Sequence, residues 1–338
     1  MGLLDALKKA QEQQKTGSKE SPVIPSAVTL APNQQVPAAK SAPGARDFSL
    51  LSPEIVHKIL DNIDDLPTLP TVAKKVMDEL NNPQSNAKDI ADIIKNDQAI
   101  TAKILKVGNS AYYAGYSPCT TVQGAVTRIG FLQIKRMILS ISILDTFSKF
   151  ERKNFNLKEF WTHSIATGYA SRIIGKLSGF RDSDDLFTAG LLHDLGKLIT
   201  LRYLPDLFDG ILKKMEDEQS ISYFEAEKGL SPVTHCDIGS WLAIKWNMSR
   251  DIQNVIYNHH LPPFKSTLFE KDVIMFSSIV YLANKIVKSL NLGLTGDKAC
   301  EHDPEIFDFV FRGRVPLEKL KDEILKEKPV IEAATAAL

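Results

Sequence analysis

Five of the chain's seven histidines lie between residues 163 and 260, in segments whose apolar spacing predicts helices. They are His163, His193, His235, His259 and His260. Neutral imidazole nitrogens are common ligands of divalent transition metals. A fold that brought these rings together would form a polar pocket able to bind such an ion. Each ring taken alone is equally consistent with a satisfied core histidine or a surface side chain.

Two local patterns strengthen the expectation of a metal site. His193 and Asp194 are adjacent and follow an apolar segment at 186–192, so they present an imidazole and a carboxylate close together. Glu159 precedes His163 by four residues, which places both side chains on one face of a helix. We therefore expect each pair to be able to direct its two side chains to one ion.

His259 and His260 stand at the end of a helix that is expected to begin near Ser249. Gly239 lies one turn after His235, where the missing side chain would let a neighbouring helix approach closely.

Helix-start signals recur from residue 52 onward, each combining a capping side chain with a proline or an acid. They are Ser52-Pro53-Glu54, Asn86 to Asp89, Ser231-Pro232 and Asp303-Pro304-Glu305. Apolar residues between them recur at three- and four-residue spacing, and alternating strand-like runs with hairpin turns are absent from the sequence. The pattern predicts an all-α chain of about a dozen helices.

The chain divides into segments of different composition. Residues 1–14 predict a short amphipathic helix, and 15–47 are rich in Pro and Ala without aromatics, which predicts a disordered linker. A polar seam near 150–156 divides the helical region that follows, and residues 291–338 predict a C-terminal helical extension. The histidines cluster only after the seam.

Composition narrows the function. The 41 basic and 41 acidic residues balance, which argues against nucleic acid or an anionic membrane as the main ligand. The basic pairs Lys135-Arg136 and Lys213-Lys214 are the main support for nucleic-acid binding, and such pairs are typical of solvated helix faces.

Cysteine usage and hydropathy indicate the compartment. Cys119, Cys236 and Cys300 are widely spaced, which predicts free thiols in a reducing environment. The most apolar run, 137–144, is too short to span a bilayer. We expect a cytoplasmic protein without a membrane partner.

Several motifs together resemble those of the HDOD family, named for an HD-related output domain. They are Leu66-Pro67-Thr68-Leu69-Pro70, Ile94-Lys95-Asn96-Asp97, Asn109-Ser110-Ala111-Tyr112-Tyr113, Ala125-Val126-Thr127-Arg128-Ile129-Gly130, Ala189 to Lys197, and His259-His260. The resemblance runs from about residue 52 to 290. It implies a helical N-terminal subdomain (52–150) packed on an HD-like helical bundle (151–290), in a signalling or regulatory module.

The resemblance also implies site roles, taken from metal-dependent phosphohydrolases of the wider HD superfamily. It implies metal ligands at His163, His193, Asp194, His235, His259, His260, at Glu159 as an added acid, and at the late position occupied by Asn284. Lys197, three residues after Asp194, matches the lysine that would neutralise a phosphate.

Two departures from the superfamily pattern stand out. Asn284 replaces an expected aspartate, so the site loses one anionic ligand. The GYP element of the HD-GYP phosphodiesterases is replaced by Leu261-Pro262-Pro263-Phe264, which argues against cyclic-di-GMP hydrolysis.

Two functions remain open. The first is a regulatory module that contacts protein partners of a signalling pathway and whose pocket binds a divalent metal (Fe, Mn or Zn), a nucleotide or nothing. The second is a metal-dependent phosphohydrolase or phosphodiesterase acting on a nucleotide or cyclic dinucleotide, with Lys197 offsetting transition-state charge. Tyr112, Tyr113 and Tyr116 could form a partner surface or pack the two subdomains together.

Overall fold

The fold is all-α, as predicted. The computed structural model describes residues 66–336, apart from 294–302 and gaps at 81, 83, 95–96, 114, 149, 151, 153–154, 181–183, 219–220, 263 and 266–268. Within these ranges the regular elements are α-helices, beside one isolated bridge between Arg152 and Phe155. The predicted helix at 1–14, the linker at 15–47 and the helix start at Ser52 lie outside the described residues.

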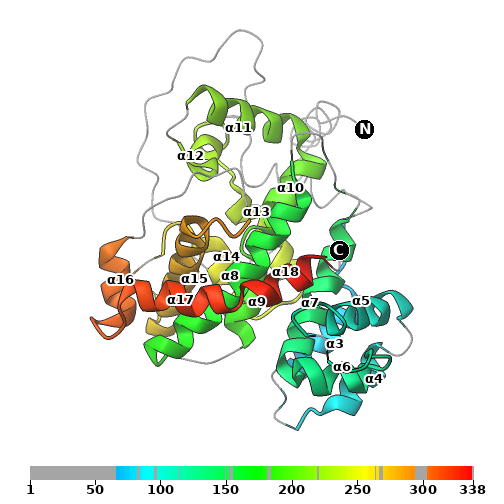
Figure 1. The fold of residues 1–338 in the computed structure, drawn as a ribbon. Helices are drawn as coiled ribbons and strands as arrows, with labels where there is room; N and C mark the ends of the chain where they lie inside the picture. Colours follow the sequence, from blue (N-terminus) through cyan, green and yellow to red (C-terminus); the bar gives the residue numbers. More distant parts are fainter. Residues whose placement is uncertain are drawn as a thin grey trace, which may run out of the picture.

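The first group of helices lies at the lower right in Figure 1. It consists of α3 (Thr71–Leu80), α4 (Ala87–Ile94), α5 (Gln98–Gly108), α6 (Val122–Ile129) and α7 (Phe131–Phe147). Helix α7 is buried around most of its circumference, because α3, α5 and α6 pack against it and it also contacts α9 of the second group. Side chains of α7 therefore pack against both the first and the second group of helices.

The second group is a bundle around a long, largely buried helix, α8. It consists of α8 (Leu157–Ser178), α9 (Asp184–Leu192), α10 (Leu195–Tyr203), α11 (Pro205–Asp217), α12 (Tyr223–Lys228), α13 (His235–Lys245), α14 (Arg250–Asn258) and α15 (Lys271–Ser289). Helices α9 and α15 pack on α8, and α10, α13 and α14 follow one another across the bundle.

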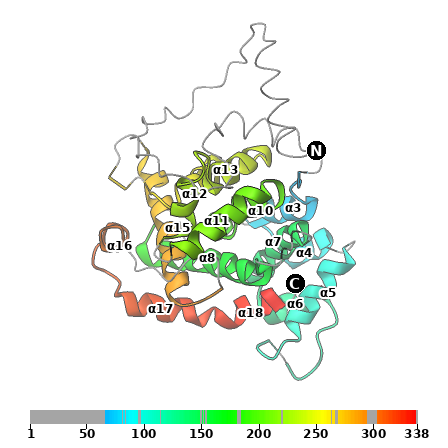
Figure 2. The ribbon, with the colours of Figure 1, turned by 90° about the horizontal axis from the view of Figure 1, so that it is seen from above.

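Three helices end the described chain and run along the outside of the bundle (Figure 2). They are α16 (Pro304–Phe311), α17 (Leu317–Lys326) and α18 (Lys328–Ala336). All three contact α8, and α18 also contacts α7.

Local capping explains most helix starts. Asp303 caps α16 with Pro304 in its first turn, Ser249 caps α14, and Asn86 and Asp89 exchange hydrogen bonds with the backbone at the start of α4. These predicted starts are confirmed.

The start predicted at Ser231-Pro232 is wrong. Helix α13 begins at His235, because Thr234 and Asp237 form a capping box there. The Ser231 hydroxyl instead accepts a hydrogen bond from the backbone of Val233 within the preceding turn.

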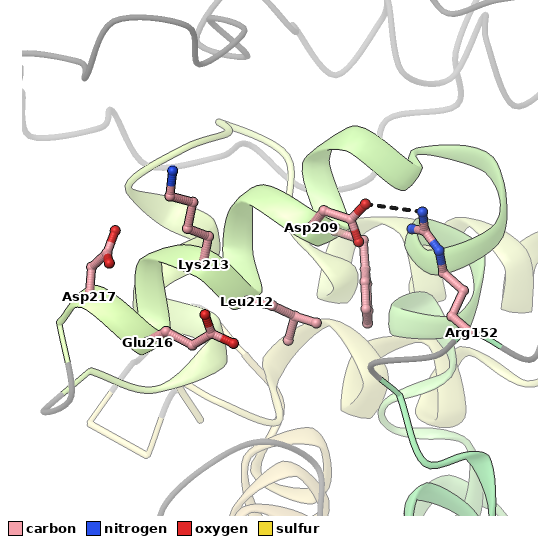
Figure 3. A pocket seen from close by; sticks show the side chains of 7 residues that line it. Arg152, Asp209, Leu212, Lys213, Glu216 and Asp217 are labelled. Carbon is pink, nitrogen blue, oxygen red and sulfur yellow. Dashed lines mark hydrogen bonds and ion pairs between the residues drawn. The ribbon is translucent and has the colours of Figure 1, made fainter.

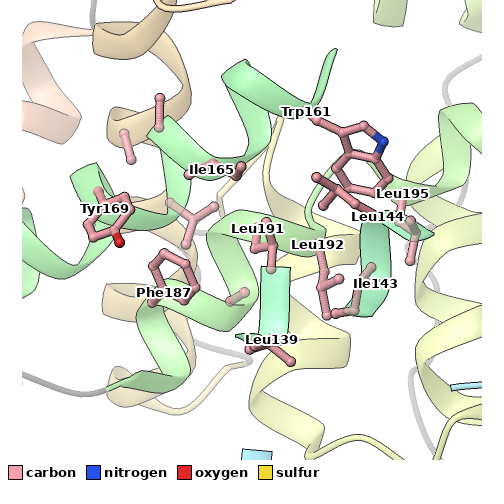
Figure 4. Close-up of a cluster of buried hydrophobic side chains, with 14 of the residues drawn as sticks. Leu139, Ile143, Leu144, Trp161, Ile165, Tyr169, Phe187, Leu191, Leu192 and Leu195 are labelled. Carbon is pink, nitrogen blue, oxygen red and sulfur yellow. The ribbon is translucent and has the colours of Figure 1, made fainter. Parts of the chain in front are cut away.

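The core joins the two groups of helices. Large apolar side chains from α7, α8 and α9 interlock in Figure 4, among them Leu139, Trp161 and Phe187, each at most 2% exposed. Dense packing of this kind fixes the relative positions of the helices that carry the histidines.

The basic pair Lys135-Arg136 is not on a solvated face, contrary to the sequence-based interpretation. Both side chains are buried on α7. Lys135 donates to the carbonyl oxygen of Glu79, and the Arg136 guanidinium donates to Asp184 at 2.7 Å. Since their charges are satisfied inside the protein, they offer nothing to a nucleic acid.

None of the described helices combines the length and apolar character needed to cross a lipid bilayer.

Candidate metal site

The five histidines between residues 163 and 260 lie together in one pocket. Adjacent ring centroids are 5.3 Å apart for His163 and His193, 5.0 Å for His193 and His259, and 5.3 Å for His235 and His259. His260 lies 4.3 Å from His259 by the same measure. The predicted convergence of these rings is therefore present in the structure.

Four separate parts of the bundle supply the pocket. His163 projects from α8, His193 and Asp194 occupy the break between α9 and α10, His235 is the first residue of α13, and His259-His260 directly follow α14. Asn284 lies on α15, and its place in the ligand set stays a prediction. Most of these side chains, including Asp194, are 0% exposed, while His260 is half-buried.

Glycines allow the helices to approach closely enough. A Cβ on Gly190 would lie 2.7 Å from the carbonyl oxygen of Thr167, so α9 lies directly against α8 beside His163. A Cβ on Gly196 would overlap the carbonyl oxygen of His235, and one on Gly239 would lie 3.2 Å from the Gly196 nitrogen. The close approach predicted at Gly239 is confirmed, and it presses α10 against α13.

Hydrogen bonds at Nδ1 orient three of the imidazoles. Nδ1 lies 2.7 Å from Gly190 O in His193, 2.7 Å from Ile256 O in His259 and 2.6 Å from Glu227 Oε2 in His235. Because each of these acceptors requires a proton on Nδ1, the neutral ring presents the lone pair of Nε2 to the pocket. Metal-binding histidines in proteins are commonly held in this way.

Three buried polar atoms in the pocket have no hydrogen-bond partner. They are His163 Nδ1, His193 Nε2 and Asp194 Oδ1. Buried polar atoms are rarely left unsatisfied in folded proteins. All three are metal-ligating atom types, and their residues can offer ligand atoms within 4.8 Å of one another. The residues present therefore fit a divalent transition metal.

Asp194 is the central anion of the pocket. Its Oδ2 accepts a hydrogen bond from Lys197 at 2.9 Å, and its Oδ1 lies 3.3 Å from His235 Nε2 and 3.4 Å from His259 Nε2. Burial alone would raise the pKa of Asp194, but Lys197 and His193 outweigh it and hold that pKa well below its usual range. The carboxylate is therefore ionised at neutral pH.

The histidine side chains in the pocket differ in the direction in which their pKa values are shifted. Burial lowers the pKa of His163 and of His193, so both rings are neutral at neutral pH and able to bind metal. Burial would also lower the pKa of His235, but Cys236 and Glu227 outweigh it and raise that pKa well above its ordinary value. Binding of an ion at His235 would therefore release a proton.

Glu159 is half-buried, as His260 is. It lies one turn before His163 on α8, and its backbone nitrogen donates a hydrogen bond to the capping side chain of Asn156. Its role as a ligand stays a prediction, as does the phosphate-binding role of Lys197, which is 1% exposed and lies 4.7 Å above the Tyr223 ring.

Sequence reasoning missed three residues around the pocket. Glu227 accepts hydrogen bonds from both the backbone and the ring of His235, Cys236 adds a buried thiol beside the same ring, and Phe224 stacks on His260 at 4.4 Å between centroids. Phe224 and Glu227 lie on α12 and Cys236 in the first turn of α13, and no metal-ligand spacing marks them in the sequence. The acid eight residues before His235 is the one signal that could have been noticed.

Substitution of Glu227 by glutamine is expected to lower metal affinity by about 10–100-fold, because an amide holds the His235 tautomer less firmly than a carboxylate does. Competition between the protein and a chromophoric chelator for zinc would measure the change. Glu216→Gln, at an exposed position on α11, is the matched control and should leave affinity unaltered. Equal affinities for the Glu227 variant and the control would show that Glu227 does not support a ligand.

A separate hollow of about 420 Å³ lies on the surface along α11 (Figure 3). Arg152 and Asp209 form an ion pair of 3.0 Å across it, and the remaining lining mixes acidic, basic and apolar side chains. Phe208, which lines it, packs on Tyr223, and Tyr223 packs on His235. The hollow is therefore divided from the histidine pocket by two aromatic rings.

Comparison with known proteins agrees with this geometry. The HDOD domain model matches residues 66–262, which is more than half of the chain. An uncharacterized protein of Treponema pallidum (strain Nichols) is 26% identical over 239 residues, covering 70% of this chain. The match spans 45% of that longer protein.

Solved structures share the fold. An HDOD domain protein of unknown function from Geobacter sulfurreducens superposes with a TM-score of 0.68 at 24% identity, covering 84% of this chain and 96% of that one. A protein from Shewanella amazonensis SB2B, described as a candidate metal-dependent phosphohydrolase, superposes with a TM-score of 0.50 at 26% identity and the same coverages. With the matched domain, the shared all-helical fold and the assembled histidine pocket, this chain belongs to the HDOD family.

Proposed function

We propose that this chain is a non-catalytic regulatory module of a signalling pathway, in which the histidine pocket holds a divalent transition metal ion that stabilises the bundle. Iron, manganese and zinc are the candidate ions, since the ligand set combines imidazoles with a single carboxylate and an amide oxygen. Protein partners would bind the outer surfaces of the helices.

Closure of the pocket is the observation that carries this proposal. The side chains of His163, His193, Asp194, His235 and His259 are all 0% exposed. Catalytic metal sites keep a position open for water or substrate, whereas structural sites are enclosed by protein ligands. A phosphoester could not reach these ligands without movement of the surrounding helices.

Asn284 supports the same conclusion. It is 2% exposed on α15, and its Oδ1 has no hydrogen-bond partner, as expected of an atom that would complete a ligand set. An amide oxygen can complete a coordination shell, but it supplies no charge to balance a divalent ion. The set is therefore better suited to holding an ion than to driving hydrolysis.

A metal-dependent phosphohydrolase is the second candidate, and Lys197 is the observation that favours it. This buried ammonium group lies beside Asp194, where it could neutralise a phosphate after the helices open. A bound metal would supply Lewis-acid activation of the phosphoryl group. The description of the Shewanella relative as a candidate phosphohydrolase points the same way.

Elemental analysis combined with a turnover assay separates the two candidates. Protein purified without chelators or a histidine tag is expected to contain about one or more equivalents of metal and to leave generic phosphodiesters and cyclic dinucleotides uncleaved. Metal-dependent turnover that is lost on Lys197→Met would overturn the regulatory proposal in favour of the second candidate. Protein free of metal under all conditions would contradict both.

Asn284→Asp is expected to raise metal affinity about tenfold or more, because a carboxylate replaces a neutral oxygen ligand. The metal-free variant should melt at a lower temperature than wild type, since it buries an uncompensated charge. Calorimetry with and without added zinc would therefore show a larger metal-dependent shift in Tm than wild type. Asn284→Ala is the control and should show a smaller shift; a shift no larger in Asn284→Asp than in this control would remove Asn284 from the ligand set.

A partner surface is available on the first group of helices. Tyr112 is 55% exposed and Tyr116 is fully exposed, so neither ring packs the two groups together. Exposed aromatic rings are enriched at protein interfaces. We propose this segment as a contact for a protein partner.

A further inference from the structure

The thiol of Cys236 lies among the three histidines at the α13–α14 end of the pocket. Its side chain is buried, and its Sγ is 3.7 Å from His235 Nε2. Cys236, His235, His259 and His260 can each offer one ligand atom such that all four atoms lie within 4.8 Å of one another. They form a second potential ligand group beside the one that contains His163 and His193.

Three of the distances between these atoms match tetrahedral coordination. Zinc–nitrogen bonds of about 2.0–2.1 Å and zinc–sulfur bonds of about 2.3 Å give tetrahedral edges of about 3.3 Å between nitrogens and about 3.6 Å between nitrogen and sulfur. His235 Nε2 lies 3.3 Å from His259 Nε2 and 3.1 Å from His260 Nε2, and Cys236 Sγ lies 3.7 Å from His235 Nε2. Cys236 Sγ also lies 3.9 Å from His259, at Nδ1, so a small shift of the thiol would bring it beside the Nε2 atoms.

The surroundings of these nitrogens also suit a cation. The Nδ1 atoms of His235 and His259 face Glu227 and Ile256, so their Nε2 atoms face each other at 3.3 Å, with either a shared proton or a metal ion between them. Oδ1 of Asp194 is buried and lies within 3.4 Å of both nitrogens. Two nitrogen ligand atoms and an anion thus converge on one point.

We propose that Cys236 supplies a thiolate ligand to a metal ion held by His235, His259 and His260, which makes this half of the pocket a zinc-selective His₃Cys site. A soft thiolate strengthens the preference for zinc over manganese that the imidazoles already confer, whereas carboxylate and amide oxygens weaken it. Cys236 also lies in the first turn of α13, where the positive end of the helix favours a negative charge. The inference rests on the proposal that the pocket holds metal.

Cobalt substitution tests the thiolate directly. Apo-protein prepared with a chelator and titrated with cobalt(II) should develop the near-ultraviolet charge-transfer band of a cobalt–thiolate bond. Cys236→Ser should bind cobalt without this band. In competition experiments its ratio of zinc affinity to manganese affinity should fall by about tenfold or more. Cys119→Ser is the matched control, because that thiol is also buried but hydrogen-bonds to Thr121 O near α6; it should keep the band.

The outcomes distinguish metal binding by the pocket as a whole from ligation of the metal by Cys236. Wild-type protein that binds neither cobalt nor zinc would contradict the metal pocket itself. Cobalt binding without the band, with equal affinity in Cys236→Ser, would overturn the role of Cys236 and leave the pocket intact. Should the serine variant fail to fold, X-ray absorption of the zinc-loaded wild type decides the matter, since a sulfur shell at about 2.3 Å is expected and a shell of nitrogen and oxygen alone would exclude the thiolate.

Discussion

Replacing Asp194 with alanine is expected to lower the free energy of unfolding by about 3–5 kcal/mol, because it leaves the Lys197 ammonium buried without its counter-ion. The two groups are 2.9 Å apart, and the lysine is 1% exposed. Urea denaturation in the presence of a chelator would measure the change without a contribution from metal binding.

The double variant Asp194→Ala/Lys197→Met is the control for this expectation. It removes both charges, so it should recover most of the lost stability. A loss below about 1 kcal/mol in the single variant would mean that Lys197 reaches solvent readily and that the pocket is far more open than its burial indicates.

The Asp194–Lys197 pair also makes the stability of the metal-free protein depend on pH. Since the pKa of Asp194 is depressed in the folded state, its contribution to stability is present above the unfolded pKa of about 4. It is lost as the pH falls from there toward the folded pKa. The double variant should lack this component of acid destabilisation.

Gly196→Ala is expected to lower the free energy of unfolding by about 3 kcal/mol or more and to impair metal binding. The new Cβ would overlap the carbonyl oxygen of His235 and lie 2.8 Å from the backbone nitrogen of Gly239. Backbone atoms cannot move aside as a flexible side chain can, so α10 and α13 must separate. That separation would draw Asp194 away from His235.

Gly210→Ala on α11 provides the comparison. Its Cβ would meet nothing closer than Leu230 Cδ1 at 3.7 Å, so the greater helix propensity of alanine should leave stability unchanged or raise it by up to about 1 kcal/mol. Denaturation and zinc titration of the two variants side by side would check both effects. Equal stability and equal zinc affinity in both would show that the α10–α13 contact is not needed to assemble the pocket.

The fold class and the histidine cluster could be predicted because their signals are local. Apolar spacing and capping residues act within a few positions, and they were sufficient for α4, α14 and α16. His193-Asp194 and His259-His260 are paired in the sequence itself. The motif resemblance then indicated that these distant pairs would meet.

The errors and omissions arise where tertiary contacts decide the outcome. Two capping groups compete before α13, and the sequence alone does not rank Ser231 below Thr234. Lys135 is buried because a carbonyl oxygen from α3 lies within reach of its ammonium group, which no periodicity records. Glu227 and Cys236 join the pocket only because α12 packs against the start of α13, where Glu227 accepts hydrogen bonds from His235.

The position of α18 has a mechanical consequence. Thr335 on this helix lies 3.4 Å from Thr162, the neighbour of His163 on α8, while the Ala336 carbonyl accepts a hydrogen bond of 2.8 Å from Lys106 on α5. One short terminal helix is thus fastened to both halves of the molecule at consecutive residues. Any motion that separates the two groups of helices must therefore break these two contacts in addition to the buried core that α7, α8 and α9 share.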